Sequence, residues 1–199
     1  MKNNRIDFEA RFWSGSDTYS GLRLIETFFQ FNELATAKEM LNNIMICAAK
    51  KKCVIKEDHS AVFHFHQALH SFVRACYVLG LKQEKSYLKM YAENNAPQMK
   101  GSLSDQEYRN PFLVFQKAFA EYSLKDFEYY ISVSVYFSLG VYAHSAESEI
   151  LGPSIHLTKM LDAAFLILEM GRKKRDNSYK KKQRMKKKDD RMMKVFRIL

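Results

Sequence analysis

Apolar residues recur at spacings of three and four in one segment after another, which is the pattern of helices that bury one face. Only 7 Gly and 3 Pro occur in 199 residues, too few for the many tight turns of an all-β fold. We therefore expect an all-α protein, an antiparallel bundle of six or seven helices. The periodic segments are 22–29, 34–48, 62–76, 112–122, 124–135 and 157–168.

Capping residues predict where several of these helices begin and end. Asp58 or Ser60 is a suitable N-cap for the third helix, and Gly80 is a suitable left-handed stop after Leu79. A shorter helix is expected over 83–93. Asn110 and Pro111 then have the residue types favoured at the N-cap and the first helical position.

Ser123 begins the next helix, with Asp126 three residues later as its partner in a capping box. The stretch 131–135 alternates apolar and polar residues as a strand does, but the surrounding spacing is helical, so we interpret it as helix. The last periodic helix is expected to start at Pro153 and to end at Gly171.

The charge of the chain is concentrated after Gly171. The segment 172–199 contains 14 Lys or Arg against 3 acids, a net charge of +11, whereas the segment 1–171 holds 18 basic and 19 acidic side chains, a net charge of −1. We therefore divide the chain into one helical domain over 1–171, with a flexible loop at about 94–105, and a basic tail over 172–199.

Dense like charges repel, so the tail is expected to be disordered or a solvated extension of the preceding helix. A segment of this kind binds polyanions, either nucleic acid or an anionic membrane surface; the alternative is an end that only aids solubility. The candidate polyanion-binding residues are Arg172, Lys173, Lys174, Arg175, Lys180, Lys181, Lys182, Arg184, Lys186, Lys187 and Lys188.

The three cysteines and the N-terminal sequence bear on the compartment of the protein. Cys47, Cys53 and Cys76 are odd in number and form no Cys-x-x-Cys pair, so a disulfide framework is not expected. Residues 1–10 lack the apolar stretch of a signal peptide, and no apolar run approaches the roughly 20 residues that span a bilayer. We expect a cytoplasmic protein with no transmembrane segment.

A polar cluster on the 58–79 helix is the main candidate for chemistry. His66 and His70 are four residues apart and can grip a divalent metal, or they can line a polar seam with Arg74 and bond to a neighbouring helix. We favour the seam and expect no metal. Arg74 must lie at the surface or meet an acid, and we favour the surface. The sequence has neither a nucleophile motif nor a Gly-rich phosphate loop, so we assign no catalytic residue and no cofactor.

The run 63–75, which contains His66-Gln67-Ala68, resembles the central helix of HEPN-type helical domains. Segments 110–124 and 155–164 are similar to uncharacterised helical proteins of Bacteroidetes genomes and mobile elements. HEPN nucleases carry an Arg followed four to six residues later by a His, and the pair acts on the RNA phosphodiester. Here His70 precedes Arg74, so the resemblance implies a binding role rather than cleavage.

Two functional hypotheses follow. The first is a non-enzymatic helical binding or regulatory module, whose partner is a protein, or a nucleic acid or other polyanion bound by the tail. The alternative is an RNA-directed HEPN-like nuclease or toxin-like factor that uses His66, His70 and Arg74.

Overall fold

The computed structural model describes residues 10, 20–50, 53–81, 100–140 and 152–172. Helix accounts for 83% of these residues, which contain no strand, and this confirms the all-α helical bundle. Residues 131–135 are helical, as we expected. The helices are α2 (Gly21–Phe31), α3 (Leu34–Ala49), α4 (His59–Leu81), α6 (Asp105–Arg109), α7 (Phe112–Glu121), α8 (Leu124–Ser138) and the 152–172 helix.

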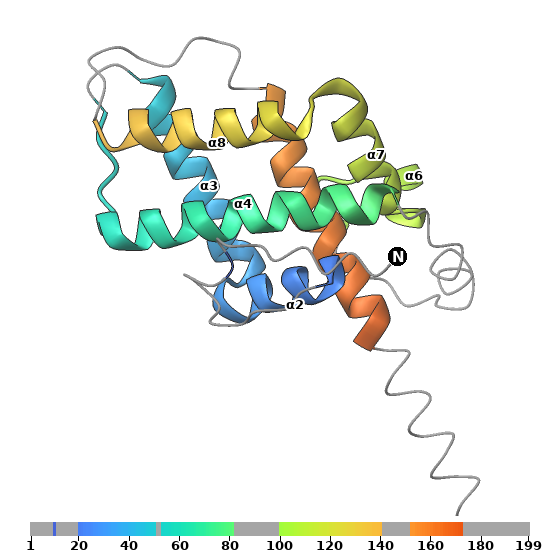
Figure 1. The fold of residues 1–199 in the computed structure, drawn as a ribbon. Helices are drawn as coiled ribbons and strands as arrows, with labels where there is room; N and C mark the ends of the chain where they lie inside the picture. The colour runs from blue at the N-terminus through green and yellow to red at the C-terminus, as the bar shows by residue number, and fades with distance from the viewer. Residues whose placement is uncertain (1–9, 11–19, 51–52, 82–99, 141–151, 173–199) are drawn as a thin grey trace, which may run out of the picture.

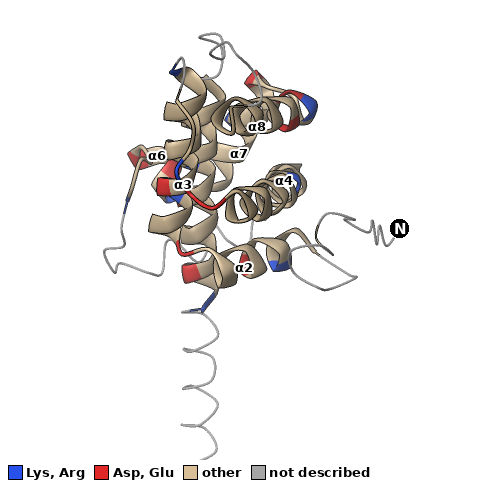
Figure 2. Cartoon of the chain, turned by 90° about the vertical axis from the view of Figure 1, so that its left-hand side faces the viewer, with Lys and Arg blue, Asp and Glu red and all other residues tan. Residues whose placement is uncertain are grey.

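The helices form two crossed layers (Figures 1 and 2). In one layer α2, α4 and α8 lie side by side, with α4 antiparallel to each neighbour, while α3 and the 152–172 helix cross behind them. Figure 1 shows α7 and the short α6 at the end of the bundle where α4 finishes. This arrangement puts α4 at the centre, in contact with α2, α7 and α8.

Aromatic side chains fill the space around α4. The ring of Phe72 lies 4.7 Å from that of Phe28 on α2, and Phe29 contacts Phe165 of the 152–172 helix at 5.4 Å. Phe28 and Phe72 are fully buried. Burying each such ring stabilises the fold by roughly 1.5–3 kcal/mol. The Phe28–Phe72 contact holds α2 on α4 within one layer, and the Phe29–Phe165 contact joins the two layers.

Capping boxes set two of the helix starts. The hydroxyl of Ser123 accepts from Asp126 N, and the Asp126 carboxylate accepts from Ser123 N, which confirms the expected capping box of α8. Ser104 and Glu107 form the same box at α6. This short helix begins at Asp105, where we expected the loop to end. The expected helix over 83–93 and residues 94–99 of the loop lie outside the described residues.

Three expected helix ends are wrong. Helix α4 runs through Gly80 to Leu81, and the 152–172 helix runs through Gly171. A Cβ at Gly80 would lie 3.1 Å from Phe115 Cβ, so this glycine allows close packing of α4 on α7 rather than a left-handed stop. Asn110 is the C-cap of α6, and the N-cap of α7 is Pro111, one residue later than expected.

The burial pattern of α2 and α3 recurs in α7 and α8, at positions numbered 90 higher. Helices α3 and α8 begin at Leu34 and Leu124, and each follows its preceding helix after the same two-residue connection. Every buried position of α3 has a buried counterpart in α8 at this offset. The pairs are Ala37 and Phe127, Leu41 and Ile131, Ile44 and Ser134, Met45 and Val135, and Ala48 and Ser138.

The burial pattern of α4 likewise recurs in the 152–172 helix, at positions numbered 92 higher. Phe65, Ala68, Leu69 and His70 match Leu157, Met160, Leu161 and Asp162, and all eight are buried. The described residues therefore contain one three-helix burial pattern twice, with a buried polar residue, His70 or Asp162, at the same place in the third helix of each pattern.

Candidate functional site

The predicted polar cluster lies where α4 faces α8, and we call its five residues, His66, His70, Arg74, Glu128 and Ser132, the α4–α8 seam. Nε2 of His66 and Nε2 of His70 each lie 3.3 Å from Ser132 Oγ. Arg74 Nε donates to Glu128 Oε1 at 2.6 Å. The fold therefore brings these residues together. The two histidines contact a neighbouring helix, as we expected of a polar seam.

Arg74 differs from the surface position that we favoured. Its side chain is about one-third exposed and forms an ion pair with Glu128. The acid belongs to another helix and lies 54 residues further along the chain, which explains why local spacing did not reveal it. The pair neutralises the guanidinium, so Arg74 does not offer a free cation to a phosphate.

Burial sets the charge state of the two histidines. Burial, followed by the nearby His66 and Arg74, lowers the pKa of His70 to about 3. Burial also lowers the pKa of His66. Both imidazoles are therefore neutral at neutral pH.

The hydroxyl proton of Ser132 is already used in a hydrogen bond within the seam. It donates to the Glu128 carbonyl oxygen at 2.9 Å, so its contacts with the two histidines require each imidazole to donate. A serine nucleophile needs the opposite arrangement, in which a neutral imidazole accepts the hydroxyl proton. The seam therefore suits helix pairing better than acyl or phosphoryl transfer.

The low pKa of His70 predicts acid lability. The unfolded chain takes up a proton at His70 below about pH 6.5 while the folded chain does so only near pH 3, so stability falls as pH falls between these values. By pH 5 this group alone costs about 2 kcal/mol relative to pH 7. We expect His70→Gln to remove about that much of the loss, measured by urea unfolding at the two pH values.

His64→Gln is the matched control, because His64 is exposed on the same helix and should leave the pH dependence unchanged. Equal losses of stability in wild type and His70→Gln between pH 7 and pH 5 would contradict the buried, neutral state of His70.

Two buried carboxylates that the sequence analysis did not identify tie the helices together elsewhere. Asp162 is 4% exposed and accepts from Lys38 Nζ at 2.8 Å and from the backbone N and Oγ of Ser102 at 2.7 Å each. Gly101, beside Ser102, has φ of +57°, and a Cβ there would overlap the Asp162 carboxylate. The 100–104 connection is thus fastened to the 152–172 helix.

Glu107 is the second of the two buried carboxylates. Burial alone would raise its pKa, but hydrogen bonds from Ser104, Lys117 and Lys159 outweigh this effect and lower the pKa to about 2. Lys117 Nζ and Lys159 Nζ each lie 3.1 Å from a Glu107 oxygen. The carboxylate is therefore charged at neutral pH and links α6, α7 and the 152–172 helix.

An open groove of about 520 Å³ passes over this cluster, between α7 and the 152–172 helix. Besides Glu107 and its two lysines it is lined by His156, whose Nε2 lies 2.9 Å from Glu121 Oε2. The positive and negative side chains in the groove pair with one another, so the groove has no excess of either charge for an ionic ligand.

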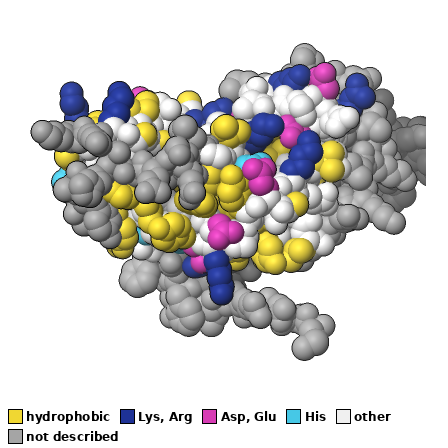
Figure 3. Space-filling model, turned by 90° about the horizontal axis from the view of Figure 1, so that it is seen from above, with side chains coloured by type: hydrophobic (Ala, Val, Ile, Leu, Met, Phe, Trp, Pro, Cys, Tyr) yellow, Lys and Arg dark blue, Asp and Glu magenta, His cyan; other side chains and the backbone are white. Residues whose placement is uncertain are grey.

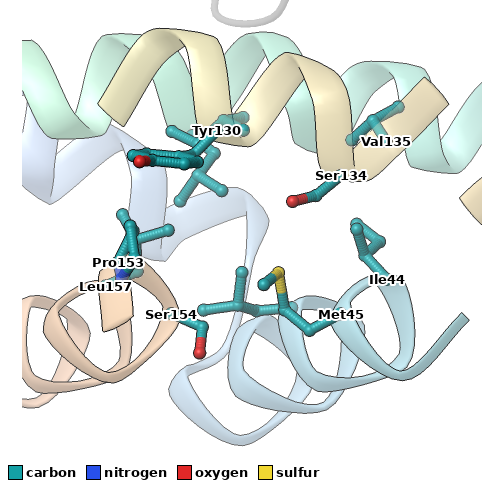
Figure 4. A pocket seen from close by; sticks show the side chains of 11 residues that line it. Ile44, Met45, Tyr130, Ser134, Val135, Pro153, Ser154 and Leu157 are labelled. Carbon is teal, nitrogen blue, oxygen red and sulfur yellow. The ribbon is translucent and has the colours of Figure 1, made fainter. Parts of the chain in front are cut away.

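A small cavity lies in the core between α3, α8 and the start of the 152–172 helix (Figure 4). Its volume is about 10 Å³, the space of roughly one water molecule, and Ile44, Met45, Tyr130 and Leu157 help to line it. The Ser134 hydroxyl points into it and has no hydrogen-bond partner among the described residues. The cavity is too small for an organic ligand or cofactor.

No group of three or more His, Cys, Asp or Glu in the described ranges could hold a metal ion. Within those ranges no helix is long and apolar enough to cross a membrane. The candidate tail residues lie outside the described residues, except Arg172, whose Nη1 pairs with Glu169 Oε1 at 2.9 Å.

Comparison with known proteins gives no relative. No family model matches the chain, and neither a curated protein nor a solved structure matches it. The HEPN-type resemblance of the 63–75 run therefore stays a prediction from the sequence.

Proposed function

We propose that the protein is a non-enzymatic helical binding or regulatory module of the cytoplasm, which contacts a nucleic acid or another polyanion through residues 172–199. The observation that carries the proposal is the separation of charge. The tail has a net charge of +11, and the segment 1–171 has a net charge of −1. Such a tail attracts polyanions by releasing their counterions.

Ion pairing within the helical body supports this division. Lys38, Arg74, Lys117 and Lys159 each lie within 3.1 Å of an acidic oxygen on another helix. On the face seen in Figure 3, basic and acidic side chains are interspersed, and Figure 2 likewise shows both signs along the helices. The described helices therefore carry both signs of charge on this face.

The α4–α8 seam supports a binding module over the alternative of an RNA-directed nuclease. Cleavage of RNA needs a histidine that exchanges a proton near neutral pH and a cation free to meet the phosphate. Here His70 has a pKa of about 3, and Arg74 is paired with Glu128. The Arg-then-His order of HEPN nucleases is also reversed in this chain.

Neutralising the tail in the full-length protein tests the proposal. We expect full-length protein to bind short labelled single-stranded RNA at about 50 mM salt, with an affinity that falls steeply as salt is added. Replacing seven tail residues by Gln should weaken binding at least about tenfold and reduce the steepness of the salt dependence by about 0.7 for each phosphate that is no longer neutralised. The seven are Lys180, Lys181, Lys182, Arg184, Lys186, Lys187 and Lys188.

The matched control replaces Lys56 and Lys125, two exposed lysines of the body, by Gln, and should bind as wild type does. Unchanged binding by the neutralised variant would contradict the proposal. The recovered RNA should be intact. Metal-independent cleavage that is lost in His70→Ala would favour the nuclease instead.

A further inference from the structure

Two of the three cysteines lie beside each other at the end of α3. Cys47 is in the last turn of α3, and its Sγ is 2.8 Å from Sγ of Cys53, in the segment that leads to α4. All three thiols are free, and Cys47 and Cys53 are half-buried whereas Cys76 is fully buried. A disulfide needs an S–S separation of about 2.05 Å, so bond formation requires a movement of under about 1 Å.

Hydrogen bonds on both sides of Cys53 fix the segment beside α3 and α8. Before it, Cys53 N donates to Lys50 O at 3.3 Å, which closes the turn at the end of the helix. After it, Ile55 N donates to Ser138 O at 2.8 Å, and Asn43 Nδ2 donates to Glu57 Oε1 at 2.6 Å. The two sulfur atoms are therefore kept close together by the fold.

We infer that Cys47 and Cys53 form a reversible intrachain disulfide, a modification site whose oxidant is a small-molecule disulfide such as oxidised glutathione. The Cys53 thiolate attacks one sulfur of the oxidant, which forms a mixed disulfide and releases one glutathione thiolate. Cys47 then loses its proton, attacks Cys53 Sγ and expels the second glutathione. In total, two protein thiols are oxidised to one disulfide while one glutathione disulfide is reduced to two thiols.

The environment of Cys47 fits its role in the second step, the attack on the mixed disulfide. Burial, followed by the adjacent Cys53, raises the pKa of Cys47 to about 11. Cys47 is therefore a thiol at neutral pH, and a thiol reacts far more slowly than a thiolate with a free oxidant. Attack on a mixed disulfide at Cys53 offsets this limitation, because the fold places the two cysteine sulfur atoms 2.8 Å apart.

The disulfide would enclose a short, strongly basic loop. Five residues separate the two cysteines, and three of them are lysines, Lys50, Lys51 and Lys52. Oxidation therefore fastens the end of α3 to the approach to α4, and the sequence between the two cysteines carries three positive charges. The inference does not depend on the function proposed for the tail.

The test equilibrates full-length protein with glutathione buffers of increasing oxidised fraction and follows its intact mass and its peptides under non-reducing conditions. We expect the chain to lose two hydrogen atoms, to yield a linked peptide pair containing Cys47 and Cys53, and to return to the original mass with dithiothreitol. Closing so small a loop should raise the thermal midpoint by about 5 °C.

Matched variants assign the reaction to this pair. Cys76→Ser should behave as wild type, while Cys53→Ser should show neither the loss of two hydrogen atoms nor the rise in midpoint. Peptide mapping of the wild type needs no variant, so it decides the question even where a variant folds poorly. The inference is overturned by separate glutathione adducts on the two cysteines, by chains joined to one another, or by thiols that stay free in oxidised glutathione.

Discussion

Replacing Asp162 by alanine is expected to lower the free energy of unfolding by about 3–4 kcal/mol, because the change removes one partner of a buried ion pair. The carboxylate is 4% exposed and accepts four hydrogen bonds, two from Lys38 Nζ and two from Ser102. Its loss leaves the Ser102 N–H without its acceptor and detaches the 100–104 connection from the 152–172 helix. Urea unfolding followed by circular dichroism measures the effect.

Asp105→Ala is the matched control for this substitution. Asp105 Oδ1 lies 2.6 Å from Lys100 Nζ, as close a pair as that of Asp162, but the Asp105 side chain is 83% exposed. An exposed pair contributes little, so we expect a loss of stability much smaller than that of Asp162→Ala. Similar losses in the two variants would show that burial does not give Asp162 the importance assigned to it here.

Lys38→Met, alone and with Asp162→Ala, separates the ion pair from the hydrogen bonds to Ser102. We expect the double variant to be less destabilised than the sum of the two single variants, by about 1–3 kcal/mol, because Lys38 and Asp162 act on each other. If the losses of unfolding free energy in the two single variants simply add, Asp162 stabilises the fold through its hydrogen bonds to Ser102 and not through Lys38.

The helices could be predicted because the signals for them are local. Apolar spacing within a segment reflects which face is buried: in the periodic segment 34–48, Ala37, Leu41, Ile44 and Ala48 recur at spacings of three and four and are buried in α3. The capping box of Ser123 and Asp126 joins residues only three apart, so it could also be predicted from the chain. Gly80 misled the prediction because its role depends on Phe115, a residue of another helix.

The partners in the candidate site could not be predicted for the same reason. His66 and His70 were identified from their spacing, but Ser132 is 66 residues beyond His66 and belongs to another helix. Asp162 and Lys38 are 124 residues apart. A single acid among Met160, Leu161, Ala163 and Ala164 was the one local sign that a buried charge needed a partner.

The repeated three-helix pattern was equally hidden from the sequence. Between residues 21–50 and 111–140 only Phe29 and Phe119, and Leu34 and Leu124, are identical at matching positions. Burial repeats while residue type does not, because volume can be redistributed among neighbours in a core. Lys38 and Glu128 occupy matching positions but carry opposite charges. Lys38 pairs with Asp162, and Glu128 pairs with Arg74.

Removal of residues 172–199 is expected to abolish most binding to polyanions while leaving the fold intact. The deletion takes away a net charge of +11, and the segment 1–171 that stays carries a net charge of −1. The aromatic core and the buried ion pairs described above all lie before Arg172. The deletion should therefore weaken polyanion binding without unfolding the protein.

The most direct measurement compares the affinity of full-length and shortened protein for single-stranded RNA at about 50 mM salt, with the thermal midpoint of each chain recorded beside it. We predict an affinity at least about a hundredfold weaker for the shortened chain and a midpoint changed by no more than about 2 °C. Equal affinities would contradict the account. So would a shortened chain that unfolds or aggregates, because Val195, Phe196, Ile198 and Leu199 would then be part of the fold.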